Sequence, residues 1–180
     1  MPIHPPTAEQ LQLLPLRAIV AYASRSARRP AKVLLDGVVA EEVDTLLGVA
    51  DRFVVCRDSQ PSDVLAALGA ASDVARAASS LPRESVDAWL AAAAARSVAM
   101  TMYSVVQWML RLKPACACAS KAASYAVGAA EAADILEEPA ATAARQAALR
   151  DYECFVKAFG IHDNVILGEP FDPSEIAGIQ

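Results

Sequence analysis

The chain has 180 residues, a formal net charge of −5 and a hydrophobic fraction of 55%. This length suits one domain with a single core and argues against a second domain. The negative charge argues against a general nucleic-acid-binding protein. About forty residues are alanine, the best helix former, so the apolar composition predicts helices before it predicts a membrane protein.

The first expected helix follows a proline-rich leader. Thr7, with Gln10 three residues later, is typical of a capping box that opens a helix. Pro15 leaves two alternatives: it begins the main helix after a short turn over residues 7–14, or it kinks one longer helix. We expect this first helix to end at Pro30, which removes a backbone donor.

Three arginines, Arg25, Arg28 and Arg29, lie in the last turns of this expected helix. They belong to a stretch in which every charge is positive, whereas the formal charges of residues 161–180 are all negative. One hypothesis is that this acidic tail docks near the end of the first helix, in the same chain or on a neighbouring subunit. The alternative is that the arginines complement the helix dipole and the tail is disordered.

The remaining chain predicts five further helices, because apolar residues recur at helical spacing and the alternation of strands is absent. Pro114 and Pro139 suit the first turns of two of them, and Gly160 suits the end of the last. The expected ranges are residues 38–57, 63–79, 84–113, 115–136 and 140–159.

The helix over residues 84–113 is expected at the centre of the fold. Beyond Trp89 it is apolar on nearly every side and carries only basic charges, so other helices must surround it. Its uncharged run, residues 97–110, is about fourteen residues long, against the roughly 18 needed for a membrane span. We therefore predict no transmembrane segment.

The central helix is also the expected source of large side chains for the helix over residues 115–136, which consists mainly of small residues. Met102, Tyr103, Trp108 and Met109 exceed what alanine-rich neighbours can bury. They belong to the core by default, and the sharper hypothesis is a Met- and aromatic-rich groove for a partner helix or for self-association.

The pair formed by Cys116 and Cys118 invites a metal or redox interpretation. Residues two apart on a helix point about 200° apart, so both thiols cannot easily bind one ion. We expect small core residues instead, and four buried thiols in a reducing cytoplasm. The four cysteines are Cys56, Cys116, Cys118 and Cys154.

Catalytic patterns are weak. Histidine occurs only at His4 and His162, and a nucleophilic arrangement would have to combine His162 with Cys154 and Asp163. No nucleotide-binding or hydrolase motif is present, and the carboxylates lack metal-site spacing. We expect no catalytic residue, no metal and no cofactor.

Two segments, R-x-I-V-A-Y-A-S-R-S-A-R-R over residues 17–29 and R-D-Y-E-C-F-V over residues 150–156, flank the alanine-rich middle, and D-P-S-E follows at residues 172–175. Together they resemble a group of uncharacterised alanine-rich, all-helical bacterial proteins. Members of that group often have cysteine at the position of Ser26, and a tryptophan-containing connector that this chain lacks. The resemblance implies an all-helical fold in a bacterial cytoplasm, and no activity.

These observations predict an all-α domain of about six helices over residues 7–160, with a leader over residues 1–6 and an irregular acidic tail over residues 161–180. The expected function is a non-enzymatic protein–protein interaction module: an adaptor, scaffold or regulatory subunit. Its partner is another protein or a second copy, and neither nucleic acid nor a membrane is expected. A small-ligand binder or enzyme with a pocket near the central helix is the alternative, and an accessory or inhibitory protein of a bacterial toxin or defence system is the third.

Overall fold

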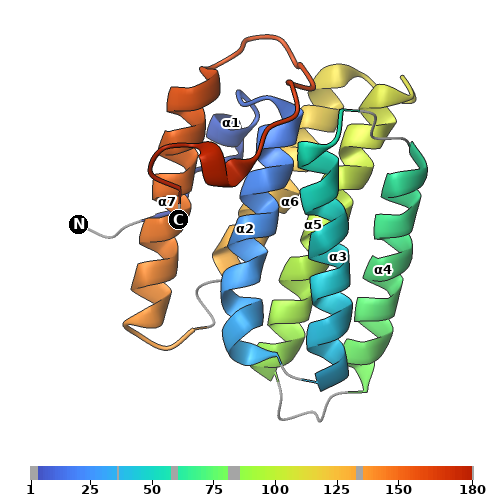
Figure 1. Cartoon of the computed structure of the whole chain (residues 1–180), viewed down its shortest axis with the longest axis vertical. Helices are drawn as coiled ribbons and strands as arrows, with labels where there is room; N and C mark the ends of the chain where they lie inside the picture. Colours follow the sequence, from blue (N-terminus) through green and yellow to red (C-terminus); the bar gives the residue numbers. More distant parts are fainter. Residues whose placement is uncertain (1–3, 36, 58–60, 81–85, 133–135, 180) are drawn as a thin grey trace.

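A computed structural model describes residues 4–35, 37–57, 61–80, 86–132 and 136–179. Over these residues the chain forms one all-helical domain without strands, as predicted (Figure 1). Helices α7, α2, α3 and α4 lie across the front of the bundle in Figure 1, and α5 and α6 lie behind them. The helices are α1 (Ala8–Leu11), α2 (Leu16–Leu34), α3 (Gly37–Val55), α4 (Pro61–Ser79), α5 (Val86–Met109), α6 (Ala115–Glu131) and α7 (Ala140–Phe159), followed by the 3-10 helix η2 (Pro173–Glu175).

The central helix is α5, which contacts α2, α3, α4 and α6. Its inward side chains, among them Val98, Met102 and Val105, are fully buried. The buried residues of α6 are alanines and Cys118. Small side chains let α6 approach α5 closely, so the large side chains of this contact come from α5, as the sequence predicts.

By length and composition α5 is also long and apolar enough to cross a membrane, but 61% of its most apolar window is buried inside the bundle. The core helix of a helical bundle shows the same combination of apolar composition and burial. Packing against four neighbouring helices therefore accounts for the composition of α5.

Helix α2 does not end at Pro30, as expected, but continues to Leu34 with Pro30 inside it. The proline loses one backbone hydrogen bond. Ala27 and Ala31, one turn apart on either side of it, are both buried in the core, so packing holds the helix together across the interruption. Lys32 is the basic residue of its last turn, and the arginines lie further inside the helix, so the dipole explanation does not apply to them.

The two alternatives for Pro15 are resolved in favour of a separate first turn. Helix α1 is capped by Thr7 and Gln10: the Thr7 N–H donates to Gln10 Oε1 at 2.8 Å, and the Gln10 N–H donates back to Thr7 Oγ1 at 3.4 Å. Pro15 is the N-cap of α2, which begins one residue later. This separate α1 brings the number of α-helices in the described chain to seven.

Three predicted helices end early, and α3 stops at Val55 instead of residue 57. Helix α5 stops at Met109 instead of residue 113, because Arg111 has a φ of 55° and the Leu112 N–H donates to the Gln107 carbonyl at 2.9 Å. Helix α6 stops at Glu131 instead of residue 136. The predicted start of α5 at residue 84 lies outside the described residues, whereas α7 has the predicted bounds and ends at Gly160.

Residues 161–179 run back across the bundle (Figure 1). Helix α2 begins after a proline, without a side-chain cap, and its first amides find partners in this segment. The N–H groups of Leu16 and Arg17 donate to the carbonyls of Ile166 and Leu167 at 2.9 and 3.0 Å. The tail thus supplies acceptors that the start of every helix needs.

Candidate functional site

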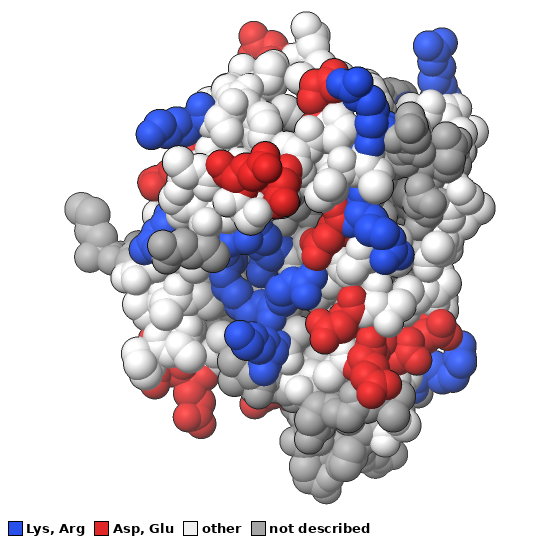
Figure 2. Space-filling model, viewed as in Figure 1, with Lys and Arg blue, Asp and Glu red and all other residues white. Residues whose placement is uncertain are grey.

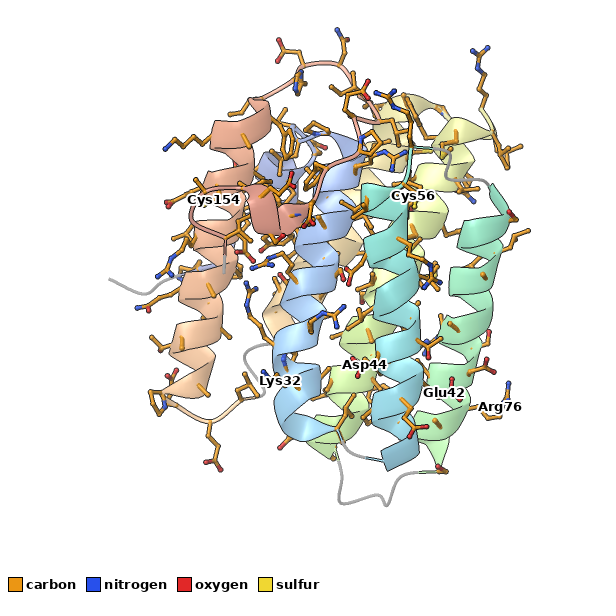
Figure 3. All side chains as sticks on the ribbon, viewed as in Figure 1. Lys32, Glu42, Asp44, Cys56, Arg76 and Cys154 are labelled. Atoms are coloured by element: carbon orange, nitrogen blue, oxygen red, sulfur yellow. The ribbon has the colours of Figure 1, made fainter. Side chains whose placement is uncertain are left out.

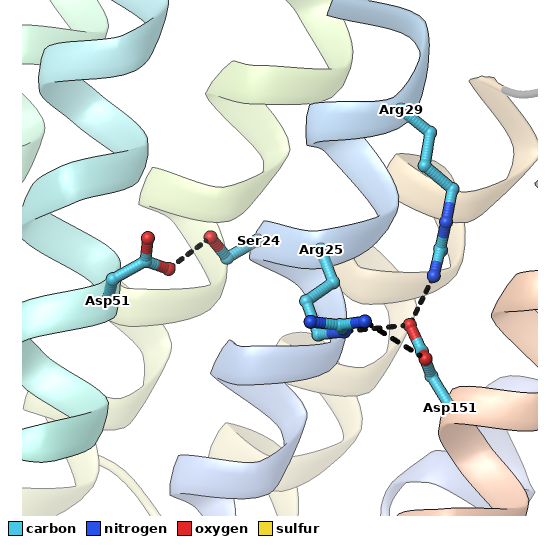
Figure 4. Close-up of polar contacts among 5 residues, drawn as sticks. All are labelled: Ser24, Arg25, Arg29, Asp51 and Asp151. Carbon is cyan, nitrogen blue, oxygen red and sulfur yellow. Dashed lines mark hydrogen bonds and ion pairs between the residues drawn. The ribbon is translucent and has the colours of Figure 1, made fainter. Parts of the chain in front are cut away.

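Arg25 and Arg29 of α2 converge on one carboxylate of α7, that of Asp151 (Figure 4). The Asp151 side chain is only 3% exposed. Arg25 Nε donates to its Oδ2 at 3.0 Å and Arg25 Nη2 to its Oδ1 at 3.4 Å, while Arg29 Nη2 donates to Oδ2. Because a buried charge is costly without partners, this three-residue cluster fixes α7 against α2.

The third arginine, Arg28, faces α3. Its Nη2 lies 2.6 Å from Asp51 Oδ2 and its Nη1 lies 3.6 Å from Asp44 Oδ1. The Ser24 hydroxyl donates to the other oxygen of Asp51 at 2.7 Å (Figure 4). Asp44 and Asp51 are exposed, so these pairs are worth less than the buried cluster at Asp151.

These cations border an open pocket of about 520 Å³ between α2, α3 and η2. Figure 2 shows the Lys and Arg side chains gathered on this face, with carboxylates around them. Lys32 projects from α2 in the same region (Figure 3). Val55 and Pro173 add apolar surface, and Asp51 and Asp172 add negative charge. The pocket therefore combines a cationic wall with an apolar one.

The acidic tail does lie against this part of its own chain, and its Asp172 borders the same pocket as Arg25, Arg28 and Arg29. Glu169 pairs with Arg57 at 3.4 Å, and the Asp172 carboxylate accepts the Ser174 N–H at 2.8 Å. A hydrogen bond from the Ser174 hydroxyl at 2.7 Å, together with the one from its N–H, lowers the pKa of Asp172 below its ordinary value. The tail is held by backbone hydrogen bonds and by Phe171, whose ring centroid lies 4.6 Å from that of Phe159 and 5.9 Å from that of Phe155.

Three buried polar atoms near Asp151 have no hydrogen-bond partner among the described residues: Tyr22 Oη, Ser26 Oγ and Arg29 Nη1. Burial raises the pKa of Tyr22 well above its ordinary value, and the neighbouring Ser26 hydroxyl lowers it by a smaller amount. The core beside the Asp151 cluster is thus polar and incompletely hydrogen-bonded.

Arg17 has a structural role that the sequence did not indicate. Its buried guanidinium donates to the carbonyls at the end of α3, those of Phe53, Val54 and Cys56, and lies 4.9 Å from the centroid of the Phe53 ring. A cation at a helix C-terminus satisfies free carbonyls and complements the dipole. Arg17 therefore caps α3 from α2.

The candidate groove residues of α5 are divided between core and surface. Met102 is fully buried, and Trp108 and Met109 pack partly against the core. Tyr103 is 36% exposed. Of the four, Tyr103 is the side chain that a partner reaches most readily.

A surface stripe runs along the outer face of α5, and sequence reasoning did not identify it as one unit. It consists of Val86, Trp89, Ala93, Met100 and Tyr103 on one side of the helix, at intervals of three, four, seven and three residues, with the exposed Arg96 in the seven-residue interval. Val86 is 56% exposed and Trp89 is 52% exposed. The repeat of three and four residues was the available signal, but only the fold shows which side of α5 is left uncovered.

A shallow pocket of about 230 Å³ lies beside the stripe, between α5 and α6. Four of its lining residues, Leu90, Ala93, Ala94 and Ser97, have the spacing of a helix surface hole. From α6 it is lined by Gly128, Glu131 and Ala132. Small side chains therefore leave room for a larger side chain from another helix.

The chemical candidates of the sequence are not brought together. Cys116 is exposed and Cys118 is buried, so the two thiols point apart as predicted, and burial raises the pKa of Cys118. Cys56 is also exposed, contrary to the expectation of four buried thiols, and it lies on a different element from Cys154 (Figure 3).

His162 Nε2 lies 2.9 Å from the Phe159 carbonyl. Within the described residues no group of three or more His, Cys, Asp or Glu side chains could hold a metal ion.

The chain matches no protein-family model, no curated protein and no solved structure. The resemblance to alanine-rich bacterial proteins therefore stays a prediction.

Asp151 is the functional side chain that sequence reasoning missed. It occupies an inward position of α7, with Ala144, Ala148 and Phe155 on the same buried face. The available signal was an acidic residue on the otherwise apolar face of this helix, because an acid in that position needs a basic partner on a neighbouring helix.

Proposed function

We propose that the protein is a non-enzymatic interaction module of the cytoplasm that binds a helix of another protein, or of a second copy, through the stripe on α5. The observation that supports this is the exposure of large apolar side chains, above all Trp89, on a helix whose other sides are packed. A contiguous exposed apolar patch is a common mark of an interaction surface. Aromatic side chains are also enriched among the residues that dominate binding energy.

Photocrosslinking tests this proposal. Benzoylphenylalanine replaces Trp89 in the full chain, and the cells are irradiated. The matched control carries the same amino acid at Arg150, an exposed position on α7. We expect a discrete adduct from position 89 and none from position 150. Equal labelling at both positions, or no adduct at either, would show that the stripe is not a binding surface.

A second candidate function rests on the pocket over α2, whose described lining residues include none from the central helix α5, where the sequence predicts a pocket. There the protein would bind a small phosphorylated molecule, because guanidinium and ammonium groups recognise phosphate and the pocket has space for a ligand. The volume of about 520 Å³ is within the range of small-molecule sites.

Calorimetric titration with inorganic pyrophosphate tests this second function. The double variant Arg28→Gln/Lys32→Gln keeps the buried Asp151 cluster and removes two cations of the pocket. We expect it to abolish binding, whereas Lys157→Gln, an exposed cation on α7, leaves binding unchanged. Absence of heat with the wild-type protein would exclude a phosphate site.

A further inference from the structure

We propose that the stripe on α5 pairs with the same stripe of a second copy, antiparallel, about a two-fold axis that passes at the level of residue 98. This inference rests on the proposed function and names its partner. A two-fold interface requires a self-complementary surface, in which each element on one copy meets its counterpart on the other. The stripe meets this requirement in spacing, in side-chain size and in the charges at its two ends.

The spacing of the stripe fits antiparallel pairing. Val86, Ala93 and Met100 are seven residues apart, and Trp89 and Tyr103 lie between and beyond them at the alternating three- and four-residue intervals of a coiled coil. Leu110, in the described turn after α5, lies seven residues beyond Tyr103 and is 48% exposed. Residues 86–110 span about 36 Å at the helical rise, long enough for a two-helix interface.

Side-chain size fixes the register. Residue 98 lies midway between residues 93 and 103, so the two-fold axis sets the Tyr103 ring of one copy opposite Ala93 of the other. Ala93 belongs to the pocket between α5 and α6, whose lining also includes the small residues Ser97 and Gly128. A large side chain thus faces a hole on each copy, and the same axis sets Val86 opposite Leu110.

Charge supports the antiparallel direction. Asp87 is exposed in the first turn of α5, and Arg111 is exposed just beyond its last turn. Antiparallel pairing about residue 98 sets Asp87 of one copy opposite residue 109 of the other, two residues from Arg111. Parallel pairing would instead place like charges side by side at both ends.

Arg96 is the charged residue within the stripe, close to the axis. Its aliphatic stem can lie on the apolar surface while its guanidinium reaches water, but two copies of this charge repel each other across the axis. Replacing it by an apolar residue should therefore strengthen the dimer, which is the opposite of what a structural role for Arg96 predicts.

Charge reversal at the two ends of α5, measured by sedimentation equilibrium on the full chain, tests the pairing. Asp87→Lys and Arg111→Glu should each weaken self-association by roughly tenfold at low salt, because each puts like charges at both ends of the interface. The double variant, and an equal mixture of the two single variants, should regain it, since both restore opposite pairs. Lys157→Glu on α7 is the matched control and should change nothing, and Arg96→Leu should tighten association.

The outcomes separate this inference from the proposed function. A wild-type chain that sediments as a monomer, or two single variants that do not restore association when mixed, would overturn the pairing. If position 89 nevertheless crosslinks to a different protein, the interaction module stands and its partner is not a second copy. If both experiments are negative, both proposals fail.

Discussion

At the scale of single residues, Asp151 holds the buried charge on which the attachment of α7 depends. Asp151→Asn keeps the shape of the side chain but removes the buried anion that Arg25 and Arg29 share. We expect a loss of about 3 to 5 kcal/mol in the free energy of unfolding, as for other broken buried pairs. Urea denaturation measures it, with Glu153→Gln, an exposed neighbour on α7, as the control. Equal stability of the two variants would show that the cluster is dispensable.

A second prediction concerns Tyr22 and the free energy of unfolding at alkaline pH. Burial raises its pKa above the ordinary value of 10.0, so above about pH 10 the unfolded chain loses the phenolic proton while the folded chain keeps it. The unfolded state then binds fewer protons, and the free energy of unfolding falls as the pH rises. Tyr22→Phe should reduce this slope between pH 9 and pH 11 and leave stability near pH 7 unchanged or raised, since its hydroxyl lacks a described partner. Identical slopes for wild type and variant would refute the assignment.

At the scale of elements, the tail over residues 161–179 is a structural part of the bundle. Phe171→Ala removes a ring that contacts Phe155 and Phe159, and we expect a loss of about 2 kcal/mol together with faster proteolysis of the tail. Ile161→Ala, at an exposed tail position, is the control. Tail cleavage should depend little on salt, because rings and backbone hydrogen bonds hold it. Cleavage that accelerates strongly with salt would instead favour docking by its acids.

The helices differ in how well the sequence predicts them, for local reasons. Helix α7 lies between Pro139 and Gly160, which mark both ends by backbone chemistry alone. Helix α2 passes through Pro30 because burial on both sides outweighs the lost hydrogen bond. Helix α5 ends two residues before Arg111, a left-handed residue where glycine would have given the signal. Tertiary packing decides the first of these boundaries.

The candidate sites, like the helix boundaries, can be predicted from the sequence only in part. The arginines of α2 and the surplus of large side chains on α5 are visible in the sequence. The partner of Arg25 and Arg29 lies more than 120 residues away, on a helix whose position only the fold defines. Likewise Met102 and Tyr103 are neighbours in sequence, yet the first is buried and the second exposed, because α5 is covered on some sides and not on others.

At the scale of the whole molecule, stability and association should depend on opposite sides of α5. Met102→Ala leaves a cavity among fully buried neighbours and should lower the free energy of unfolding by about 2 to 5 kcal/mol without changing the interaction surface. Trp89→Ala should do the reverse and weaken association while stability changes by less than about 1 kcal/mol, as at most surface positions. Denaturation and sedimentation of both variants measure the two effects. Loss of both properties in either variant would mean that core and interface are not separate.

The backbone hydrogen bonds between the start of α2 and the tail also set an order of events during synthesis. Leu16 and Arg17 emerge from the ribosome about 150 residues before Ile166 and Leu167, the residues that accept their amide hydrogens. At the usual rate of translation this interval is roughly 8 to 30 s. The first long helix is therefore made early but remains uncapped until the tail follows, and the nascent bundle spends that time with an unfinished end that chaperones can recognise.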